Sequence, residues 1–184
     1  PRYAEKGTLG EEKKLLLELR LIADVGLIGL PNAGKSSLLS VLTNATPKIG
    51  NYPFTTLEPN IGMINSHAIA DIPGLIEGAS KGKGLGIEFL KHIEKTKVLV
   101  HCIDSTDENV DKTYSTVRKE FEQYNTSLLD KPEIILLTKI DLASEETIKK
   151  NVRILKKKGK KVLTASIYQP ETLELLKQEL EKIY

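Results

Sequence analysis

The chain has 184 residues, of which 40% are hydrophobic and 28% charged, and its net charge is +2. This length fits one domain with a full hydrophobic core, or a domain with a short arm. The small net charge does not by itself indicate nucleic-acid binding, and DNA is not an expected partner. A single cysteine, Cys102, excludes an internal disulfide and indicates a reducing, cytoplasmic environment. No apolar run is long enough to span a membrane.

The N-terminal part of the chain is polar and predicts no core element. Residues 1–14 carry two glycines and are expected to form a linker, and residues 15–21 alternate partly between apolar and charged side chains, which favours an extended segment. We therefore assign residues 1–22 to a linker and residues 23–184 to one folded domain. The chain starts at Pro1 rather than methionine, which is compatible with a piece of a longer protein.

The rest of the chain alternates between strand and helix patterns. The predicted strands are residues 23–29, 61–64, 67–70, 98–103, 133–137 and 161–164. The predicted helices are one beginning before residue 38, residues 87–95, 109–124 and 145–157, and one beginning at residue 170. This alternation predicts a three-layer α/β fold, in which a mostly parallel six-stranded sheet is covered by helices on both faces. The hairpin around residues 65–66 adds the one antiparallel strand.

A glycine-rich stretch lies between the first predicted strand and the first predicted helix. It matches the phosphate-loop pattern G-x-x-x-x-G-K-[ST] without a gap and consists of Gly29, Leu30, Pro31, Asn32, Ala33, Gly34, Lys35 and Ser36. Its glycines let backbone N–H groups point at phosphate oxygens, and the helix N-terminus adds positive partial charge. Lys35 is expected to reach the β- and γ-phosphates as a catalytic residue, and Ser36 to offer its hydroxyl to Mg²⁺. An ordinary glycine-containing turn is the alternative, which the motifs below oppose.

Two further segments have the residues that a magnesium-nucleotide site requires. The sequence Asp71-Ile72-Pro73-Gly74 follows the hairpin, where an aspartate can hold Mg²⁺ through water and a glycine N–H can meet the γ-phosphate. Thr55 and Thr56 lie in a proline-containing loop, and one of the two hydroxyls is expected to complete the Mg²⁺ shell. Spacing alone does not choose between the two threonines.

Two loops after later strands are expected to recognise the base. Thr138-Lys139-Ile140-Asp141 resembles the guanine-recognition pattern N-K-x-D, with threonine in place of asparagine. The Asp141 carboxylate can accept from two N–H groups of guanine that adenine does not offer, which opposes the alternative of a P-loop ATPase. The stem of Lys139 can lie over the base. Thr164-Ala165-Ser166 fits the S-A-x loop that presents a backbone N–H to the guanine oxygen.

These residues together closely resemble the Obg family of GTPases. The matching stretches are residues 23–36, the first switch at 51–60, the second switch at 70–79 with 82–86, and residues 89–94. The resemblance covers roughly residue 10 to the end and implies a Ras-like P-loop G domain, bacterial-type and cytoplasmic, preceded in the whole protein by a glycine-rich domain. It implies Mg²⁺ as cofactor, GTP and GDP as ligands, and the large ribosomal subunit and its assembly as partner and role. The departures are Thr138 for asparagine, Thr164 for serine and a short hairpin.

The resemblance also chooses between the two threonines, which completes the set of site residues. By it, Thr56 is the magnesium threonine, so that Ser36, Thr56 and Asp71 serve the metal, and Lys35, Thr56 and Gly74 serve catalysis. The nucleotide-binding set is completed by Ser37, by Phe54, Thr55, Leu57 and Glu58 of the first switch, and by Ile72, Pro73, Ile140, Ala165 and Ser166.

Hydrolysis is expected to be slow. Leu75 occupies the position at which Ras-like proteins carry a glutamine that orients the attacking water, and neither switch contains an arginine. Asn32 suggests a substitute, because in related GTPases with P-N-x-G-K-[ST] this asparagine helps hold K⁺ beside the phosphates. A group supplied by the ribosome is the competing source. Two functions therefore stay open. In the first, GTP hydrolysis switches the affinity for the ribosome; in the second, the chain is a nucleotide-gated binding module whose hydrolysis is incidental.

A run of lysines near residues 156–161 has two interpretations. The run could bind RNA phosphates, but lysines at a helix C-terminus followed by Gly159 also form an ordinary helix end. The helix end is the favoured interpretation.

Overall fold

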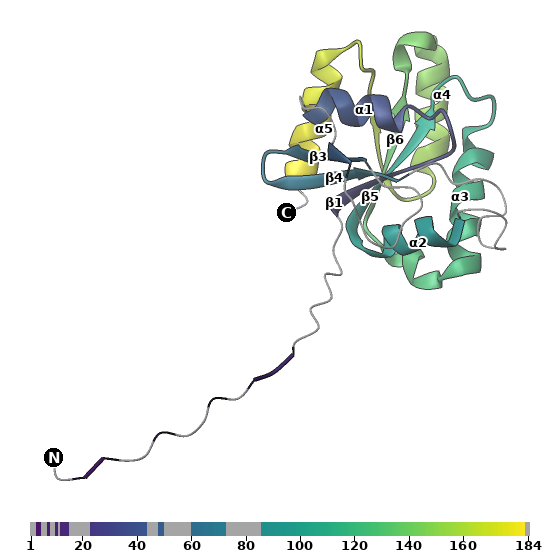
Figure 1. The fold of residues 1–184 in the computed structure, drawn as a ribbon. Helices are drawn as coiled ribbons and strands as arrows, with labels where there is room; N and C mark the ends of the chain where they lie inside the picture. The colour runs from purple at the N-terminus through teal and green to yellow at the C-terminus, as the bar shows by residue number, and fades with distance from the viewer. Residues whose placement is uncertain are drawn as a thin grey trace.

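A computed structural model of the chain describes residues 3–4, 7, 10, 12–14, 23–43, 48–49, 60–72 and 86–182 (Figure 1). The expected extended segment at residues 15–21 lies outside these ranges. The described residues form a seven-stranded sheet with the strand order β2-β3-β4-β1-β5-β6-β7. The strands are β1 Ala23–Ile28, β2 Lys48–Ile49, β3 Asn60–Ile64, β4 His67–Asp71, β5 Thr96–Asp104, β6 Glu133–Thr138 and β7 Lys161–Thr164.

The centre of the sheet is parallel, as the strand–helix alternation predicts. β1 pairs in parallel with β4 on one side and with β5 on the other, and β5, β6 and β7 continue in parallel. These strands can be nearly continuous apolar runs because helices cover both faces. Cys102 is one of their fully buried side chains. In this arrangement β1, β4, β5, β6 and β7 all end at the same edge of the sheet.

The hairpin of β3 and β4 supplies the antiparallel strand that the sequence predicts. Asn65 occupies the turn with a positive φ of 52°, a conformation that asparagine tolerates. The expected count of six strands omitted β2, a strand of two residues that pairs with β3 through Lys48 and Ile61. Since β2 runs antiparallel to β3, it points the same way as β4, and among the described strands β3 alone runs against the others.

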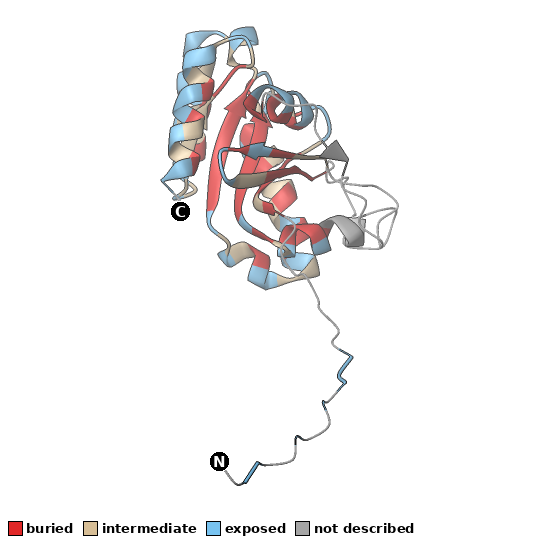
Figure 2. Cartoon of the chain, turned by 60° about the vertical axis from the view of Figure 1, so that its left-hand side comes forward, coloured by how far each residue is buried: buried red, intermediate tan, exposed pale blue. Residues whose placement is uncertain are grey.

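Helices lie on both faces of the sheet, which gives the three expected layers (Figures 1 and 2). The helices are α1 Lys35–Thr43, α2 Gly86–Glu94, α3 Val110–Tyr124, α4 Glu145–Lys156 and α5 Pro170–Glu181. Helices α1 and α5 share one apolar cluster with β1, whereas α2, α3 and α4 pack on the opposite face. Leu173, Leu176 and Leu180 of α5 are buried, as their spacing predicts. Figure 2 shows the buried strands between helices whose outer sides are exposed.

The helix ends follow local chemistry. The side chains of Asn109 and Ser144 accept from the N–H groups of Lys112 and Thr147, which caps α3 and α4. Beyond α4 the chain turns at Gly159, with a φ of 70°. Two short 3₁₀ helices that the sequence analysis did not predict, Thr126–Asp130 and Ile140–Leu142, connect the later elements.

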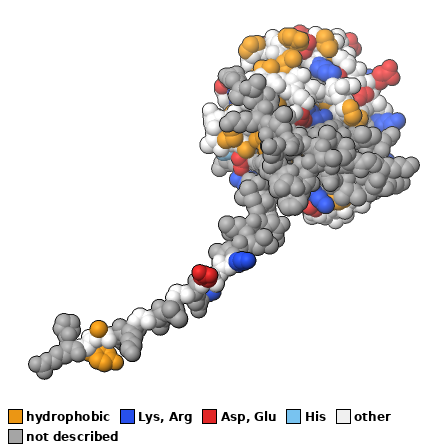
Figure 3. Space-filling model, viewed as in Figure 1, with side chains coloured by type: hydrophobic (Ala, Val, Ile, Leu, Met, Phe, Trp, Pro, Cys, Tyr) orange, Lys and Arg blue, Asp and Glu red, His pale blue; other side chains and the backbone are white. Residues whose placement is uncertain are grey.

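The lysine run near residues 156–161 forms the helix end that the sequence analysis favoured. Lys158 forms an ion pair with Asp111 at 2.7 Å, and Lys161 forms one with Glu179. These two cations are therefore partly neutralised within the domain. In the face shown in Figure 3, basic and acidic side chains both lie on the described surface. Among the described helices, none combines the length and the apolar character that a membrane crossing requires.

Candidate nucleotide-binding site

The phosphate loop connects the end of β1 to the start of α1, and its glycines are required by its shape. Gly29 has a φ of 142°, and a Cβ at this residue would lie 2.3 Å from the carbonyl oxygen of Cys102 in the neighbouring strand. Gly34 has a φ of 84°. Only glycine adopts the first conformation at no steric cost. The expected strand–loop–helix context of the motif is confirmed.

Lys35 begins α1 and is almost completely buried. Its Nζ donates to the carbonyl oxygens of Gly29 at 3.1 Å and Leu30 at 3.0 Å, which places the ammonium across the mouth of the loop. Burial lowers the pKa of Lys35, while the nearby thiol of Cys102 and carboxyl of Asp71 act in the opposite direction. A cation hydrogen-bonded to neutral carbonyl groups can exchange them for the oxygens of a bound phosphate.

Ser36 and Asp71 meet although they are far apart in sequence. β4 ends at Asp71, and the Ser36 hydroxyl donates to Asp71 Oδ2. The carboxylate is only 4% exposed, and within the described part of the chain its Oδ1 has no hydrogen-bond partner. A hydroxyl oxygen beside a buried carboxylate oxygen that lacks a partner fits Mg²⁺, which prefers oxygen ligands. Neighbouring Ile72 is buried in a core cluster, and its N–H donates to Leu27 O at 3.1 Å.

Most of the two switch segments, residues 51–59 and 73–85, lies outside the residues that the structure describes. The predicted site residues in these two ranges are Phe54, Thr55, Thr56, Leu57, Glu58, Pro73 and Gly74. Their assigned roles at the metal and the γ-phosphate stay predictions.

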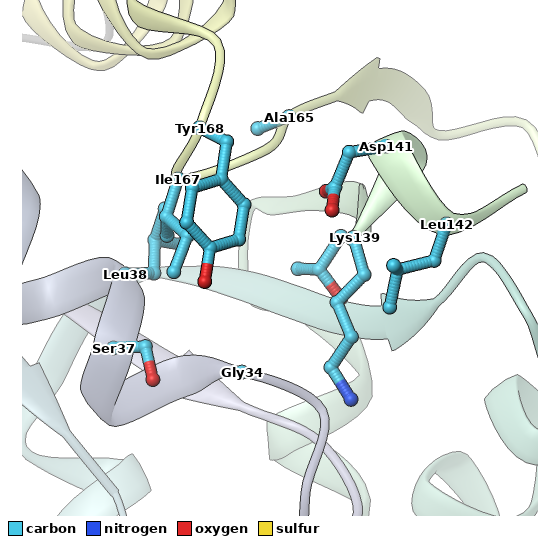
Figure 4. Close-up of a pocket in the computed structure, with 10 residues that line it drawn as sticks. Gly34, Ser37, Leu38, Lys139, Asp141, Leu142, Ala165, Ile167 and Tyr168 are labelled. Atoms are coloured by element: carbon cyan, nitrogen blue, oxygen red, sulfur yellow. The ribbon is translucent and has the colours of Figure 1, made fainter.

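A cavity of about 300 Å³ opens beside the phosphate loop, and four of the predicted base-recognition residues, Thr138, Lys139, Asp141 and Ala165, line it (Figure 4). Its lining residues are Gly34, Ser37, Leu38, Thr138, Lys139, Asp141, Leu142, Ala165, Ile167 and Tyr168. In Figure 4, Asp141 and Lys139 lie on one side of the cavity, and Ile167 and Tyr168 lie on the other. The phosphate loop and the base cavity are therefore contiguous, since Gly34 belongs to both.

The Asp141 carboxylate is oriented by a serine from another loop. Ser166 Oγ donates to Asp141 Oδ1 at 2.5 Å and also accepts from the N–H of Tyr168 at 3.0 Å. Ser166 is buried, whereas the Tyr168 side chain is 77% exposed at the mouth of the cavity. The serine bond uses one of the two carboxylate oxygens and restrains the orientation of the carboxylate. Ile140, between Lys139 and Asp141, instead packs against a core cluster.

Thr138, which stands where the N-K-x-D pattern has asparagine, braces the base-recognition loop through its hydroxyl. Its hydroxyl is buried and lies 2.8 Å from the carbonyl oxygen of Ala33 in the phosphate loop and 3.1 Å from that of Ile103 in β5. One proton can serve only one of these acceptors at a time. The contact with Ala33 connects the base-recognition loop to the phosphate loop across 105 positions of sequence.

The loop after β7 differs from its predicted register. Thr164 is the last residue of β7, and the Ala165 N–H continues the strand ladder by donating to Leu137 O at 2.8 Å. The Ser166 N–H donates to Thr172 Oγ1 at 3.1 Å. The backbone amides of Ala165 and Ser166 are therefore both occupied within the protein.

The next amide along the loop is the better placed one. Ile167 lines the cavity, and its N–H has no acceptor within the described residues. The serine that braces Asp141 is Ser166 rather than the residue at position 164. Ser166 is followed by isoleucine rather than alanine, so the S-A pattern cannot be recognised there from the sequence. Thr164-Ala165, which has the alanine, resembles the pattern more closely but lies two residues too early.

Residues 24–139 match the family model described as "50S ribosome-binding GTPase". The chain belongs to this family of GTPases. The resemblance to Obg proteins is also confirmed. The chain is 49% identical to "GTPase Obg" of Chlorobaculum tepidum, over 98% of this chain and 54% of that protein. It is 50% identical to "GTPase Obg" of Pelagibacter ubique, over 98% of this chain and 57% of that protein. The chain thus spans about half the length of these relatives.

Solved structures of similar fold are P-loop GTPase domains. The cytosolic domain of FeoB from L. pneumophila matches with a TM-score of 0.63 and 25% identity, over 86% of this chain and 67% of that chain. A variant of Era from Aquifex aeolicus, bound to GDP·AlF₄⁻, matches with a TM-score of 0.63 and 20% identity, over 86% of this chain and 56% of that chain. The predicted fold class, a three-layer P-loop GTPase domain, is confirmed.

Proposed function

We propose that this chain binds GDP and GTP together with Mg²⁺ and hydrolyses GTP slowly to GDP and phosphate, as a molecular switch. One observation carries the proposal: the Asp141 carboxylate, braced by Ser166, faces a cavity that is continuous with the phosphate loop at Gly34. A purine whose ring N–H and amino group meet Asp141 would have its phosphates beside the loop. The bidentate, charged pair favours guanine, since adenine presents no matching donors.

The phosphate end of the site supports the same proposal. Backbone amides of the loop and the N-terminus of α1 attract the phosphates, and Lys35 transfers its Nζ from two carbonyl oxygens to phosphate oxygens. Ser36 and Asp71 would hold Mg²⁺, Asp71 through water. When bound, Mg²⁺ neutralises the charge that develops on the β- and γ-phosphate oxygens. Thr56 and Gly74 complete the metal shell and the γ-phosphate contact in this proposal.

Leu75 leaves the attacking water without a glutamine, and for this reason we propose slow intrinsic hydrolysis. Asn32 would help hold K⁺ next to the phosphates as a partial substitute. The position of Asn32 supports this role. Asn32 is an exposed residue of the phosphate loop, and its φ of 63° is a left-handed backbone conformation that turns the chain at this point. Hydrolysis rates should then be higher in KCl than in NaCl at equal ionic strength. Equal rates would contradict the role of K⁺ and leave nucleotide binding untouched.

We further propose that residues 23–184 act as the G domain of a longer protein that works with the large ribosomal subunit during its assembly. The support is the family to which the chain belongs and its identity to Obg proteins. Residues 1–22 would then link this domain to an upstream one.

A competition titration tests the central proposal. Purified protein in magnesium-containing buffer should bind GDP, and excess ATP should not displace it. Asp141→Asn should weaken GDP binding on the order of 100-fold, because two charge-assisted hydrogen bonds are lost. Asp130→Asn is the matched control, since Asp130 is an exposed carboxylate in the 3₁₀ helix before β6, at the opposite end of the strands. Failure to bind GDP or GTP would overturn the proposal, and equal affinity for adenine nucleotides would overturn its guanine half.

The second candidate function is a nucleotide-gated ribosome-binding module in which hydrolysis is incidental. Leu75 favours it, since a switch driven by hydrolysis would need the missing group from elsewhere. Single-turnover GTP hydrolysis with and without large ribosomal subunits separates the two functions. A rate that rises with the subunits supports the hydrolytic switch, and an unchanged rate supports the gated module.

A further inference from the structure

Lys139 has an unusual backbone conformation that its neighbours must stabilise. Its φ of 54° and ψ of 37° lie in the left-handed region, which few residues other than glycine occupy. The residues that hold it come from the end of β5, one strand away. The Ser105 hydroxyl donates to Lys139 O at 2.9 Å, and the Ser105 N–H donates to Thr138 O at 3.0 Å. Asn151 of α4 in turn donates to Ser105 O at 3.1 Å.

The side chain of Lys139 is held at its far end by the residue before Ser105. Lys139 Nζ donates to Asp104 Oδ2 at 2.6 Å, and both side chains are largely shielded, with 34% and 24% of their surfaces exposed. Between its two ends the stem passes the phosphate loop, because Lys139 Cε lies 3.9 Å from the point that a Cβ on Gly34 would occupy. The same stem lines the base cavity opposite Tyr168 (Figure 4).

Asp104 is itself oriented before it meets the lysine. Its other oxygen, Oδ1, accepts from the N–H of Thr106 at 2.9 Å and from the Thr106 hydroxyl at 2.7 Å. Burial tends to raise the pKa of Asp104, but the hydrogen bonds from Lys139 and Thr106 hold it below its ordinary value of 3.8. The carboxylate is therefore charged at neutral pH, and its position does not depend on the lysine alone.

We infer that Asp104 is a positioning residue of the nucleotide site, which holds the ammonium of Lys139 so that the alkyl stem forms one wall of the base cavity. Without this anchor, a long side chain with four rotatable bonds would leave the wall and would have to be ordered again by each ligand. Asp104 lies outside the phosphate loop, the switches and both base-recognition loops, and it touches the base only through Lys139. The inference rests on the proposed function, the binding of guanine nucleotides.

Asp104→Ala should raise the Kd for GDP about fivefold, the factor that a partly shielded ion pair supplies. Asp104→Asn keeps an acceptor oxygen and the turn at Thr106, so it should recover part of the loss. Asp111→Ala is the matched control, because it removes the similar ion pair with Lys158 on the outer side of α3 and should leave the Kd for GDP unchanged. Thermal unfolding of each ligand-free variant would show whether the fold is retained.

A double-mutant cycle separates positioning from a merely structural effect. Lys139→Met keeps a stem of similar length but removes the ammonium, so Asp104→Ala should have no further effect on GDP binding in that background. Asp104→Ala should also weaken the binding of inosine diphosphate by the same factor as that of GDP. Inosine diphosphate lacks the amino group that Asp141 recognises, but the stem of Lys139 contacts the ring rather than that group.

Three results would overturn the inference: an unchanged Kd in Asp104→Ala, the same loss with and without Lys139→Met, or a loss confined to GDP. Failure of the unmodified protein to bind GDP would instead overturn the proposed function.

Discussion

Thr138 offers a direct test of how the two halves of the site are connected. Its buried hydroxyl lies within hydrogen-bonding distance of Ala33 O in the phosphate loop and Ile103 O in β5. Thr138→Val keeps the shape of the side chain and removes its only donor. The variant should fold, because the apolar contacts of the side chain are retained, but it should lose the connection between β6 and the phosphate loop.

The size of the effect follows from that hydrogen bond. A buried hydrogen bond contributes about 1 kcal/mol net, and leaving a buried carbonyl unsatisfied costs about 1–3 kcal/mol. We therefore expect Thr138→Val to lower the free energy of unfolding by about 1–2 kcal/mol. Because Ala33 belongs to the phosphate loop, a ligand must restore its position, so the Kd for GDP should rise by up to about tenfold, which corresponds to about 1.4 kcal/mol.

The assay pairs urea unfolding of the ligand-free protein with calorimetric titration of GDP in Mg²⁺ buffer. Thr138→Ser keeps the hydroxyl and should stay near the unmodified protein in both. Thr96→Val is the matched control, since Thr96 is a buried threonine at the start of β5 whose hydroxyl donates to Ile93 O at 2.9 Å. It should lose similar stability without losing GDP affinity. If both valine variants bind GDP equally well, the reasoning about the connection is refuted.

Two further predictions concern buried titratable groups. Burial tends to raise the pKa of Glu133, but hydrogen bonds and charges from His101 and Arg118 hold it below its ordinary value of 4.5. Its contribution to stability is therefore complete above pH 4.5 and is lost as pH falls through the lowered pKa. Glu133→Gln should cost about 3 kcal/mol in urea unfolding at about pH 7 and less near pH 3, and an equal loss at both would contradict this. Burial raises the pKa of the Cys102 thiol to about 12, so the folded protein should not react with a thiol reagent at about pH 8, and fast reaction would contradict the buried position.

The main elements of the fold could be predicted because their signals are local. Apolar runs and helical spacing identified the six longer strands and the five α-helices of the described residues to within a few positions. β2 was missed for a physical reason: a strand of two residues has no periodicity, and it exists only by pairing with β3 through Lys48 and Ile61. The 3₁₀ helix at Thr126–Asp130 likewise depends on its cap, where Asn125 accepts from the N–H of Ser127.

The site was predictable where its residues are contiguous and less so where they meet across strands. The phosphate loop is one unbroken motif, so Gly29 and Lys35 could be placed from spacing alone. The register of the loop after β7 could not be placed in this way. The hydrogen bonds between β6 and β7 decide which backbone amides remain free for a ligand, and one of these bonds occupies the N–H of Ala165. Asp104 carries no motif, since its contact with Lys139 joins positions 35 residues apart.

The contacts that hold the site join segments distant in sequence. Thr138 connects β6 to the phosphate loop, Ser166 connects the loop after β7 to Asp141, and Asp104 connects β5 to Lys139. Because the carboxyl ends of these strands are fixed side by side in the sheet, each contact joins two parts of the protein itself, so that the sheet rather than the nucleotide holds these side chains in place. Substitutions at such contacts should therefore change nucleotide affinity without removing any atom that touches the nucleotide. For the same reason, Thr138→Val should lower both GDP affinity and folding stability, whereas Thr96→Val should lower folding stability alone.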